Sequence, residues 1–505
     1  MVKGDEGKTR QSARRTRNRA NEVANTLEWL ITAFALAFVF RAFVMEAFRI
    51  PTGSMANTLL GAHYRLRCTQ CGYKYCYGQS NFKLPRGPAQ ARQEYSRCPS
   101  CGYFQATGGT ESASSGDRIL VLKCIYQFAE PRQWDVVVFK NPLDPSENYI
   151  KRLVGRPGET VEIIDGDVYI DGRISRKPPK VQEELWMPIY DNDYQPARPE
   201  EPSFNRHTWQ RPFRNAEDSN WIIEEESPTI FTLVGAPGKE HLLVYDTSRG
   251  NDFRATYAYD EIMDYRYMPY CSDLMVRFWV SSSEPVGLVG ASLSKYGIPY
   301  TGRVDFAGQM TIVRLSDGNE QVLATRTIGS PTVGRPMMLR FANVDHGLVL
   351  EFGNEKLTYD LGPGPDDAGA RRTDIEPEVK IFGAGEISIS HLALFRDIHY
   401  TARNPNSNEG GRATEGNPLK LEADQFFMLG DNSPRSEDGR WWAQPGKGNN
   451  GKIYSEGIVP REYLVGKALV VYWPAGFKPF SKSPLAIIPN VGELRFIYGG
   501  SDNAE

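Results

Sequence analysis

A run of apolar residues near the N-terminus constrains this chain more than any other feature of its sequence. The stretch from Trp29 to Phe40 carries no charged residue, and apolar residues extend it to roughly 27–45, interrupted by Arg41. About twenty helical residues cross a hydrocarbon core of about 30 Å, so the segment is long enough to span a membrane once. Arg41 is then expected to snorkel or to lie near the far interface. We therefore predict a transmembrane anchor over residues 27–46.

The residues before this run predict its orientation. Basic side chains are frequent there, namely Lys3, Lys8, Arg10, Arg14, Arg15, Arg17 and Arg19. Basic flanks stay in the cytoplasm, so residues 1–26 form a basic cytoplasmic tail. We predict a single-pass protein of the cytoplasmic (inner) membrane, with the chain after the anchor on the extracytoplasmic side. A cleaved signal peptide is the alternative, but the small-residue cleavage site expected of one is missing.

Composition limits the classes of partner. The chain has 505 residues and 40% hydrophobic content, so it can bury several hydrophobic cores. Its net charge is −3, and it lacks the basic surface that binding of nucleic acid requires. The single basic cluster lies next to the membrane, where anionic lipid is the expected partner. Glycine and proline are frequent between short runs rich in Val, Ile and aromatic residues, which favours a mainly β protein after the anchor.

Two nearly repeated Cys-x-x-Cys-Gly motifs predict a zinc-ribbon-like insertion at residues 67–110. Their cysteines are Cys68, Cys71, Cys98 and Cys101. Two such turns bring four thiolates to one tetrahedral point, and four sulfur ligands indicate a structural rather than a catalytic zinc, because no coordination position stays open. Two disulfides are the alternative in an oxidising compartment. Cys76 is close enough to substitute as a ligand, whereas Cys124 and Cys271 are expected to be ordinary buried thiols.

Short β-rich runs predict an antiparallel sheet that two insertions divide. The runs at 116–123, 135–140, 149–154 and 160–164 are followed or separated by turn residues, including the hairpin signals Asp165-Gly166 and Asp171-Gly172. The sheet-forming domain is expected in three parts: 47–66, 111–175 and 421–505, the last including a C-terminal tail.

The middle of the chain, residues 176–420, predicts an inserted linker followed by a β-sandwich. The polar, proline-rich stretch 177–214 is expected to be a loop-rich linker. Strand-like runs follow at 230–234, 275–280, 310–315, 337–341, 348–352 and 386–397. Their alternation favours a separate sandwich, loosely similar to concanavalin-like jelly-roll lectin domains. Such a domain would bind a glycan; a scaffold or protein-interaction insert is the alternative, and the sequence favours it because the similarity rests on no diagnostic motif.

The candidate catalytic pair is Ser54 and Lys151. The chain has six histidines, and none lies in a context typical of a catalytic triad. A serine can instead be activated by a lysine, provided that burial keeps the amine neutral. Apolar neighbours in the run 149–154 are suited to such burial, and we expect the strand to direct Lys151 inward and Arg152 to solvent. The alternative is a surface lysine on an alternating strand.

Four ordered segments resemble type I signal peptidases, the Ser/Lys membrane peptidases that remove secretory signal peptides. They are residues 51–55, 116–123, 149–159 and 430–440. The resemblance implies a membrane-bound serine endopeptidase that cleaves signal peptides of preproteins after small-x-small motifs such as Ala-x-Ala, with no cofactor for catalysis. The implied fold is mainly β: a transmembrane helix, then a split all-β catalytic domain carrying a zinc-ribbon-like insert and a second β-sandwich insert.

The resemblance also implies residue roles. Ser54 is the nucleophile and Lys151 the general base, whose amine Ser436 orients. The oxyanion hole combines the Ser54 backbone N–H with the Thr52 hydroxyl. Asp438 and Arg440 form a supporting ion pair behind Ser436, and Asp431 and Asn432 form a tight turn. The substrate pockets are lined by Ile50, Met55, Tyr149 and Ile150.

Two rival interpretations remain at this point. A soluble, self-cleaving repressor-type Ser/Lys peptidase shares such a core, but it carries a DNA-binding helix-turn-helix where this chain has the apolar segment. The other rival is a catalytically inactive, membrane-anchored homologue whose lectin-like insert binds cell-surface glycan or protein. The retained residues Ser54, Lys151, Thr52 and Ser436 argue against that interpretation.

Overall fold

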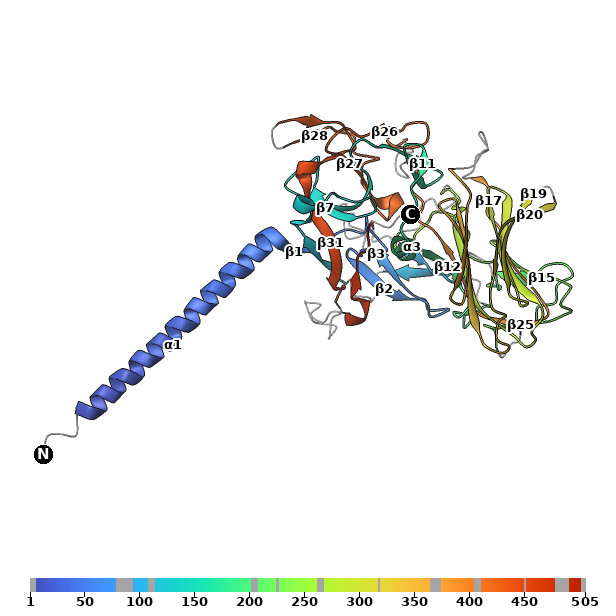
Figure 1. Cartoon of the computed structure of the whole chain (residues 1–505), viewed down its shortest axis with the longest axis horizontal. Helices are drawn as coiled ribbons and strands as arrows, with labels where there is room; N and C mark the ends of the chain where they lie inside the picture. The colour runs from blue at the N-terminus through green and yellow to red at the C-terminus, as the bar shows by residue number, and fades with distance from the viewer. Residues whose placement is uncertain are drawn as a thin grey trace, which may run out of the picture.

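A computed structural model describes residues 6–78, 94–107, 114–200, 208–223, 227–260, 268–316, 318–363, 374–403, 410–448, 451–476 and 490–500. A long N-terminal helix projects from a β-rich body, and a β-sandwich lies on the side of that body away from the helix (Figure 1). The mainly β class and the N-terminal apolar helix predicted from the sequence are confirmed. Residues 79–93, within the loop predicted between the two cysteine motifs, fall outside the described part.

The helix α1 (Glu6–Val39) continues into a π-helical turn, η1 (Phe40–Val44). Residues Glu22–Val44 form one helical segment that is long and apolar enough to cross a membrane. Its large side chains are exposed, as at Trp29 (78% exposed) and Phe38 (75%). The helical segment ends before residue 46, the expected limit of the anchor, because Met45 already begins a strand and pairs with Leu122.

An eight-stranded antiparallel sheet forms the centre of the body. In spatial order it contains β1 (Met45–Arg49), β6 (Arg118–Leu122), β31 (Leu464–Trp473), β7 (Val136–Lys140), β8 (Asn148–Gly155), β27 (Gln425–Leu429) and β30 (Val459–Pro460), with β32 (Arg495–Phe496) paired to β31. A short helix, α2 (Ile125–Phe128), follows β6. Strands from both ends of the chain therefore share one sheet, as a domain interrupted by insertions requires.

A four-stranded sheet lies at the point where the chain leaves for the large insertion and returns from it. Its order is β11 (Arg173–Ile174), β10 (Asp167–Ile170), β9 (Thr160–Ile164) and β26 (Leu419–Lys420). Asp165-Gly166 and Asp171-Gly172 connect the first three strands, and all four residues have positive φ. Two-residue hairpin turns of type I′ need this conformation, so the two predicted hairpins are confirmed.

The insertion folds as two seven-stranded sheets. One contains β12 (Met187–Asp191), β25 (Glu386–Arg396), β16 (Leu274–Ser282), β21 (Met337–Val344), β22 (Gly347–Phe352) and β23 (Glu355–Asp360), with β14 (Phe231–Val234) also on β25. The other contains β13 (Phe213–Asn215), β15 (His241–Tyr245), β24 (Val379–Ala384), β17 (Leu288–Lys295), β18 (Ile298–Asp305), β19 (Gln309–Ser316) and β20 (Asn319–Thr327). Buried side chains of both sheets, such as Phe278 and Ile381, form one core. Each predicted strand-like run of this region overlaps one of these strands.

The stretch predicted as a loop-rich linker, residues 177–214, is more ordered than expected. It contains a helix, α3 (Pro179–Leu185), and strand β12, which pairs with β25 at the edge of the sandwich. Proline suits the first turn of a helix, where its missing N–H is not needed. Polar composition hid α3, because Val181 and Leu185 are the apolar side chains that this helix buries.

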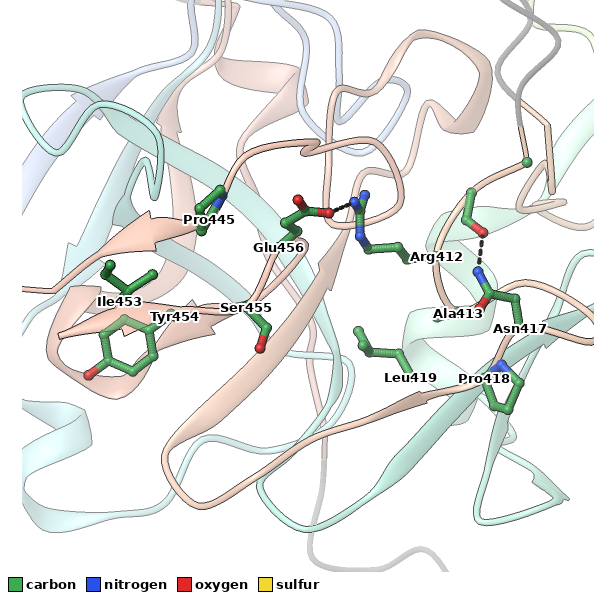
Figure 2. A pocket seen from close by; sticks show the side chains of 12 residues that line it. Arg412, Ala413, Asn417, Pro418, Leu419, Pro445, Ile453, Tyr454, Ser455 and Glu456 are labelled. Carbon is green, nitrogen blue, oxygen red and sulfur yellow. Dashed lines mark hydrogen bonds and ion pairs between the residues drawn. The ribbon is translucent and has the colours of Figure 1, made fainter.

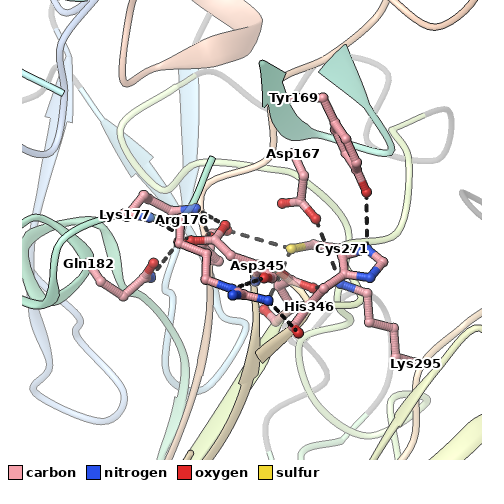
Figure 3. A network of polar contacts seen from close by, with 11 residues as sticks. Asp167, Tyr169, Arg176, Lys177, Gln182, Cys271, Lys295, Asp345 and His346 are labelled. Atoms are coloured by element: carbon pink, nitrogen blue, oxygen red, sulfur yellow. Dashed lines mark hydrogen bonds and ion pairs between the residues drawn. The ribbon is translucent and has the colours of Figure 1, made fainter. Parts of the chain in front are cut away.

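A buried ionic network joins the insertion to the four-stranded sheet (Figure 3). Lys177 Nζ lies 2.9 Å from Asp397 Oδ2 and also pairs with Asp345. Lys295 Nζ pairs with Asp273 and lies 3.7 Å from Asp167 Oδ2. Burial and the neighbouring carboxylates raise the pKa of the Asp167 carboxyl, the group that β10 contributes. Four buried aspartates thus share two lysines, and the network fixes the sandwich against the central body.

Candidate active site

Lys151 lies in β8, opposite Val137 of β7, with its side chain directed into the protein. The residue is 4% exposed, and its Nζ atom lies 2.7 Å from Ser54 Oγ. The aromatic ring of Tyr149 covers the amine at 5.4 Å. The structure therefore brings together the two predicted catalytic residues, which are 97 positions apart in the sequence.

Burial sets the protonation of this amine. It lowers the pKa of Lys151 from 10.5 to about 8, although the nearby carboxylates of Asp438 and Glu437 act in the opposite direction. At pH 7 roughly one amine in ten is then neutral, compared with roughly one in 3,000 at the unshifted pKa. A neutral amine can accept the proton of a hydroxyl at hydrogen-bond distance, so this geometry is suited to activation of the Ser54 hydroxyl.

The turn that carries Ser54 is held by Asp117, a buried residue to which sequence reasoning gave no role. Its carboxylate accepts hydrogen bonds from the backbone N–H groups of Leu60 (3.1 Å) and Ala475 (3.0 Å) and pairs with Arg495 at 2.9 Å. At the adjacent Gly116, a Cβ atom would collide with the carbonyl oxygen of Ile50. The Gly-Asp pair of the second motif therefore positions the nucleophile turn. The available signal in the sequence was an aspartate that directly follows a glycine and precedes the apolar run 119–122.

Arg152 does not face solvent, contrary to the expectation from strand alternation. It is fully buried and forms a bidentate pair with Asp431, with N–O distances of 2.8 and 2.7 Å. Both faces of β8 are buried from Lys151 to Gly155. Side chains that alternate between the two faces of this strand are therefore all buried, and Arg152 does not reach water. Charge-assisted bidentate pairs fix geometry as well as adding energy. This pair joins β8 to the turn that follows β27.

Asp438 and Arg440 form the second buried pair of the site. Their closest atoms are 2.8 Å apart, and neither side chain is exposed. Asp438 also accepts a hydrogen bond from the backbone N–H of Gly430 (3.0 Å), while Arg440 donates to the Ser433 carbonyl and hydroxyl oxygens. The pair thereby holds the loop 430–440 in place behind Ser54 and Lys151.

Ser436 and Thr52 are placed near the nucleophile but without the predicted contacts. The Ser436 hydroxyl is buried and makes no hydrogen bond with any residue in the described part of the chain, Lys151 included. A Cβ atom at Gly430 would collide with this hydroxyl and with the carbonyl oxygen of Ser54, so the serine packs directly behind the nucleophile. Thr52 is exposed. Their roles as lysine-orienting and oxyanion groups stay predictions.

The predicted substrate-binding residues divide into two groups. Ile50 (2% exposed) and Met55 (0%) belong to the hydrophobic core beneath the nucleophile, whereas Tyr149 and Ile150 are half-buried. Ile150 packs against that core. Ile50 and Met55 therefore lie in the core beneath the surface that Tyr149 and Ile150 border.

Two strand edges beside these residues are open within the described part of the chain. β1 is the terminal strand of its sheet, with β6 as its single partner there. β27 pairs with β8 only from Arg152 onward, which leaves Asn148–Lys151 unpaired on that side. An unpaired edge presents backbone donors and acceptors to which an extended peptide can add.

The four cysteines converge as predicted. The hairpins β2 (His63–Arg67) with β3 (Lys74–Gly78) and β4 (Glu94–Arg97) with β5 (Phe104–Thr107) carry them at their ends. The sulfur atoms of Cys68 and Cys101, and those of Cys71 and Cys98, are 3.6 Å apart, and all four ligand atoms lie within 4.8 Å of one another. A disulfide requires about 2.0 Å. Zn–S bonds of about 2.3 Å place tetrahedral sulfurs about 3.8 Å apart, so the four thiols fit zinc rather than two disulfides.

The other three cysteines lie outside that cluster. Cys76, considered as a substitute ligand, packs with the hydrophobic core of the central body. Cys271 is buried, as expected, but Cys124 is only partly buried because it precedes the surface helix α2.

A separate cavity of about 700 Å³ lies away from the catalytic pair. Residues of the returning chain and of the hairpin β28 (Gly446–Lys447) and β29 (Ile453–Tyr454) line it, including Arg412, Asn417 and Glu456 (Figure 2). Arg412 and Glu456 form an ion pair across it. Neither Ser54 nor Lys151 lines this cavity, so we do not assign it to the catalytic site.

Sequence reasoning missed a contribution of the insertion to this site. Tyr257 donates a hydrogen bond to the carbonyl oxygen of Asp431 (3.1 Å), and Asp260 accepts one from the side chain of Asn432 (2.9 Å). These partners are more than 170 positions apart in the sequence. No local pattern in the sequence signals such contacts.

Comparison with known proteins gives a consistent result. Residues 103–215 and 393–473 match the family described as "Signal peptidase, peptidase S26". The protein called signal peptidase I of Rickettsia akari is 33% identical over 164 residues, which are 32% of this chain and 48% of that protein. The one of Rickettsia canadensis is 34% identical over 152 residues, 30% of this chain and 44% of that protein. The chain thus spans about half the length of these curated relatives.

Solved structures show weaker similarity. Sheep galectin-11 matches 25% of this chain and 92% of its own, with a TM-score of 0.20 and 12% identity. A carbohydrate-binding module from Bacillus subtilis matches 37% of this chain and 92% of its own, with a TM-score of 0.21 and 9% identity. Scores this low carry no argument about a ligand, and glycan or protein binding by the insertion stays a prediction.

Proposed function

We propose that this protein is a membrane-bound serine endopeptidase that removes N-terminal signal peptides from preproteins, because residues 103–215 and 393–473 match the family described as "Signal peptidase, peptidase S26" and curated signal peptidases I are 33–34% identical to part of the chain. The observation that carries the proposal is the distance of 2.7 Å between Lys151 Nζ and Ser54 Oγ, with the lysine buried. An intact pair of this kind favours an enzyme over a catalytically inactive homologue.

In the proposed mechanism, neutral Lys151 accepts the hydroxyl proton of Ser54 while the serine oxygen attacks the scissile carbonyl. The lysine then returns that proton to the leaving amine, and an acyl-enzyme remains on Ser54. Water attacks the ester next, with the lysine again accepting and returning a proton. The Ser54 backbone N–H and the Thr52 hydroxyl are the proposed donors to the oxyanion, and one such donor is typically worth about 3 kcal/mol.

The open strand edges support an extended substrate. A preprotein segment would add to β1 on one side and to Asn148–Ile150 of β8 on the other, with alternate side chains directed toward the floor at Ile50 and Met55. We propose specificity for small residues at the first and third positions before the cut, because Ile50 and Met55 are buried and leave little depth for larger side chains. The helix Glu22–Val44 would keep the site at the membrane, with the basic tail in the cytoplasm.

The cysteine cluster supports a second part of the proposal, a structural zinc. Cys68, Cys71, Cys98 and Cys101 would hold the ion, which would join the two hairpins β2–β3 and β4–β5. It supplies no step of the peptide cleavage, for which we propose no cofactor.

Cleavage of a preprotein in detergent or lipid tests the proposed activity. The full chain should cleave a preprotein after Ala-x-Ala, and Ser54→Ala and Lys151→Ala should each abolish cleavage. Lys140→Ala is the matched control, because Lys140 lies in β7 on the same sheet and takes no part in the pair. A wild-type protein that does not cleave, or a Ser54→Ala variant that cleaves at the wild-type rate, would refute the proposal.

A further inference from the structure

One segment of the sandwich insertion reaches the nucleophile turn. Between Phe253 and Tyr259, alternate residues are buried. The backbone carbonyl of Tyr259 accepts a hydrogen bond from Gly78 of β3 (2.7 Å), and its hydroxyl donates one to the Ala62 carbonyl (3.3 Å). The Tyr259 ring also fills the space in front of Gly53, where a Cβ atom would collide with it. The insertion thus packs against the residue that precedes the nucleophile.

Asn432 connects this segment to the nucleophile. It is fully buried, and its backbone N–H donates to the Ser54 carbonyl at 3.0 Å. Its side-chain Nδ2 donates to the Gly53 carbonyl (3.2 Å) and to Asp260 Oδ1 (2.9 Å). Both hydrogens of the amide are therefore used, one on the nucleophile turn and one on the insertion.

The Gly53 carbonyl and the Ser54 N–H belong to the same planar peptide unit. A hydrogen bond that fixes the carbonyl therefore also fixes the direction of the N–H, which is the proposed backbone donor to the oxyanion. An amide turned by 180° would direct its oxygen at the Gly53 carbonyl and lose this hydrogen bond. The orientation of the Asn432 side chain thus decides where the Ser54 N–H points.

Asp260 is the group that selects this orientation. The other end of the amide, Asn432 Oδ1, is buried and has no hydrogen-bond partner among the described residues. No hydrogen bond to Oδ1 from the described residues therefore holds the orientation of the Asn432 amide. The carboxylate of Asp260 accepts from Nδ2, and it would repel the amide oxygen if the amide turned.

We propose that Asp260, a residue of the insertion, is a positioning residue for catalysis: by holding the Asn432 amide, it aligns the Ser54 peptide with the developing oxyanion. This inference rests on the proposed function of Ser54. It assigns the insertion a part in catalysis, in addition to any ligand that its sandwich binds.

The test compares full-length variants in preprotein cleavage, with kcat and KM measured separately. Asp260→Ala removes the acceptor and is expected to lower kcat about tenfold, because loss of one whole oxyanion donor costs about 10²- to 10³-fold and misalignment costs less. KM should change less than twofold, since Asp260 does not border the open strand edges. Asp252→Ala is the matched control: it removes a carboxylate of the same segment that contacts Arg254 instead, and it should leave kcat unchanged.

A double-mutant cycle separates positioning from general stabilisation. If Asp260 acts through Asn432, Asp260→Ala should have little further effect in an Asn432→Ala background. Where Asp260→Ala fails to fold, Asp260→Asn replaces it, because asparagine keeps the shape of the side chain and a weaker hydrogen-bond acceptor. Asp260→Asn should lower kcat about threefold in the wild-type background and have little further effect in the Asn432→Ala background. Unchanged kcat, a loss confined to KM, or an undiminished effect in the Asn432→Ala background would overturn the inference.

The two proposals fail in different ways. An inactive wild-type protein would refute the proposed function itself. A wild-type protein that cleaves, with Ser54→Ala inactive and Asp260→Ala as fast as wild type, would leave the proposed function intact and refute only the role of Asp260.

Discussion

Replacing Lys151 with methionine should make the protein more stable while abolishing cleavage. Methionine fills a similar volume without a charge. In the wild-type protein the folded state must either bury a charged amine or keep it neutral, whereas the unfolded chain hydrates it freely. We therefore expect Lys151→Met to have a higher free energy of unfolding than wild type at neutral pH.

The magnitude follows from the two pKa values of the amine. The folded value is about 8, and the ordinary value is 10.5. Each pKa unit corresponds to 1.36 kcal/mol, so the difference amounts to about 3 kcal/mol. Because the folded pKa is the lower one, the unfolded chain binds more protons between these values and wild-type stability rises with pH. The full cost to the free energy of unfolding of burying the Lys151 amine is present below pH 8, and it disappears near pH 10.5.

The assay is urea unfolding of the full chain in detergent, followed by tryptophan fluorescence between pH 6.5 and 10.5. The gain in the free energy of unfolding for Lys151→Met should be about 3 kcal/mol up to pH 8 and should shrink toward zero by pH 10.5. Lys140→Met, a partly buried lysine on the neighbouring strand, should show no such pH-dependent gain. A Lys151→Met variant that is less stable than wild type at pH 7, or a difference independent of pH, would refute the reasoning.

Three further predictions concern the pH dependence of cleavage, the buried ionic network and the cysteine cluster. The value of kcat/KM should fall about tenfold per unit below pH 8, because protonated Lys151 cannot accept a proton; a profile flat from pH 5.5 to 8 would contradict this. Lys295→Met should lower the free energy of unfolding by about 3–5 kcal/mol in urea titration, because it leaves Asp273 buried without its cation; a loss below about 1 kcal/mol would disagree. The purified protein should contain about one zinc per chain, which combined Cys68→Ser and Cys71→Ser should remove; equal metal content in both would exclude the zinc site.

Patterns local in the sequence predicted local structure well. Strands such as β16 and β21 were predictable because apolar and polar residues alternate between clear turn signals. The hairpins at Asp165-Gly166 and Asp171-Gly172 were predictable because few residue pairs tolerate two successive positive φ values. The convergence of Ser54 and Lys151 followed from their surrounding motifs rather than from spacing.

Features that depend on distant partners were not predictable. Arg152 was expected in solvent because successive side chains of a strand point to opposite faces, and the apolar neighbours of Lys151 predicted burial of one face only. Asp431, which covers the face of Arg152, is 279 positions away in the sequence. The helix α3 was missed because its polar surface resembles a linker. The approach of Asp260 to Asn432 needs the whole sandwich in place, so no window of the sequence contains it.

The separation of Arg152 from Asp431 in the sequence determines when the site around Ser54 and Lys151 is completed during synthesis. Loop closure costs only about 0.6 kcal/mol for each doubling of length, so the insertion is inexpensive at equilibrium. At a synthesis rate of about 5–20 residues per second, however, the 279 residues between these partners take roughly 15–60 s to make. During that interval Ser54 and Lys151 exist, but the loop 430–440 that packs behind them does not. Each newly made chain therefore passes through a period in which Ser54 and Lys151 are present without the loop that packs behind them, and the site is completed only after residue 440 has been synthesised.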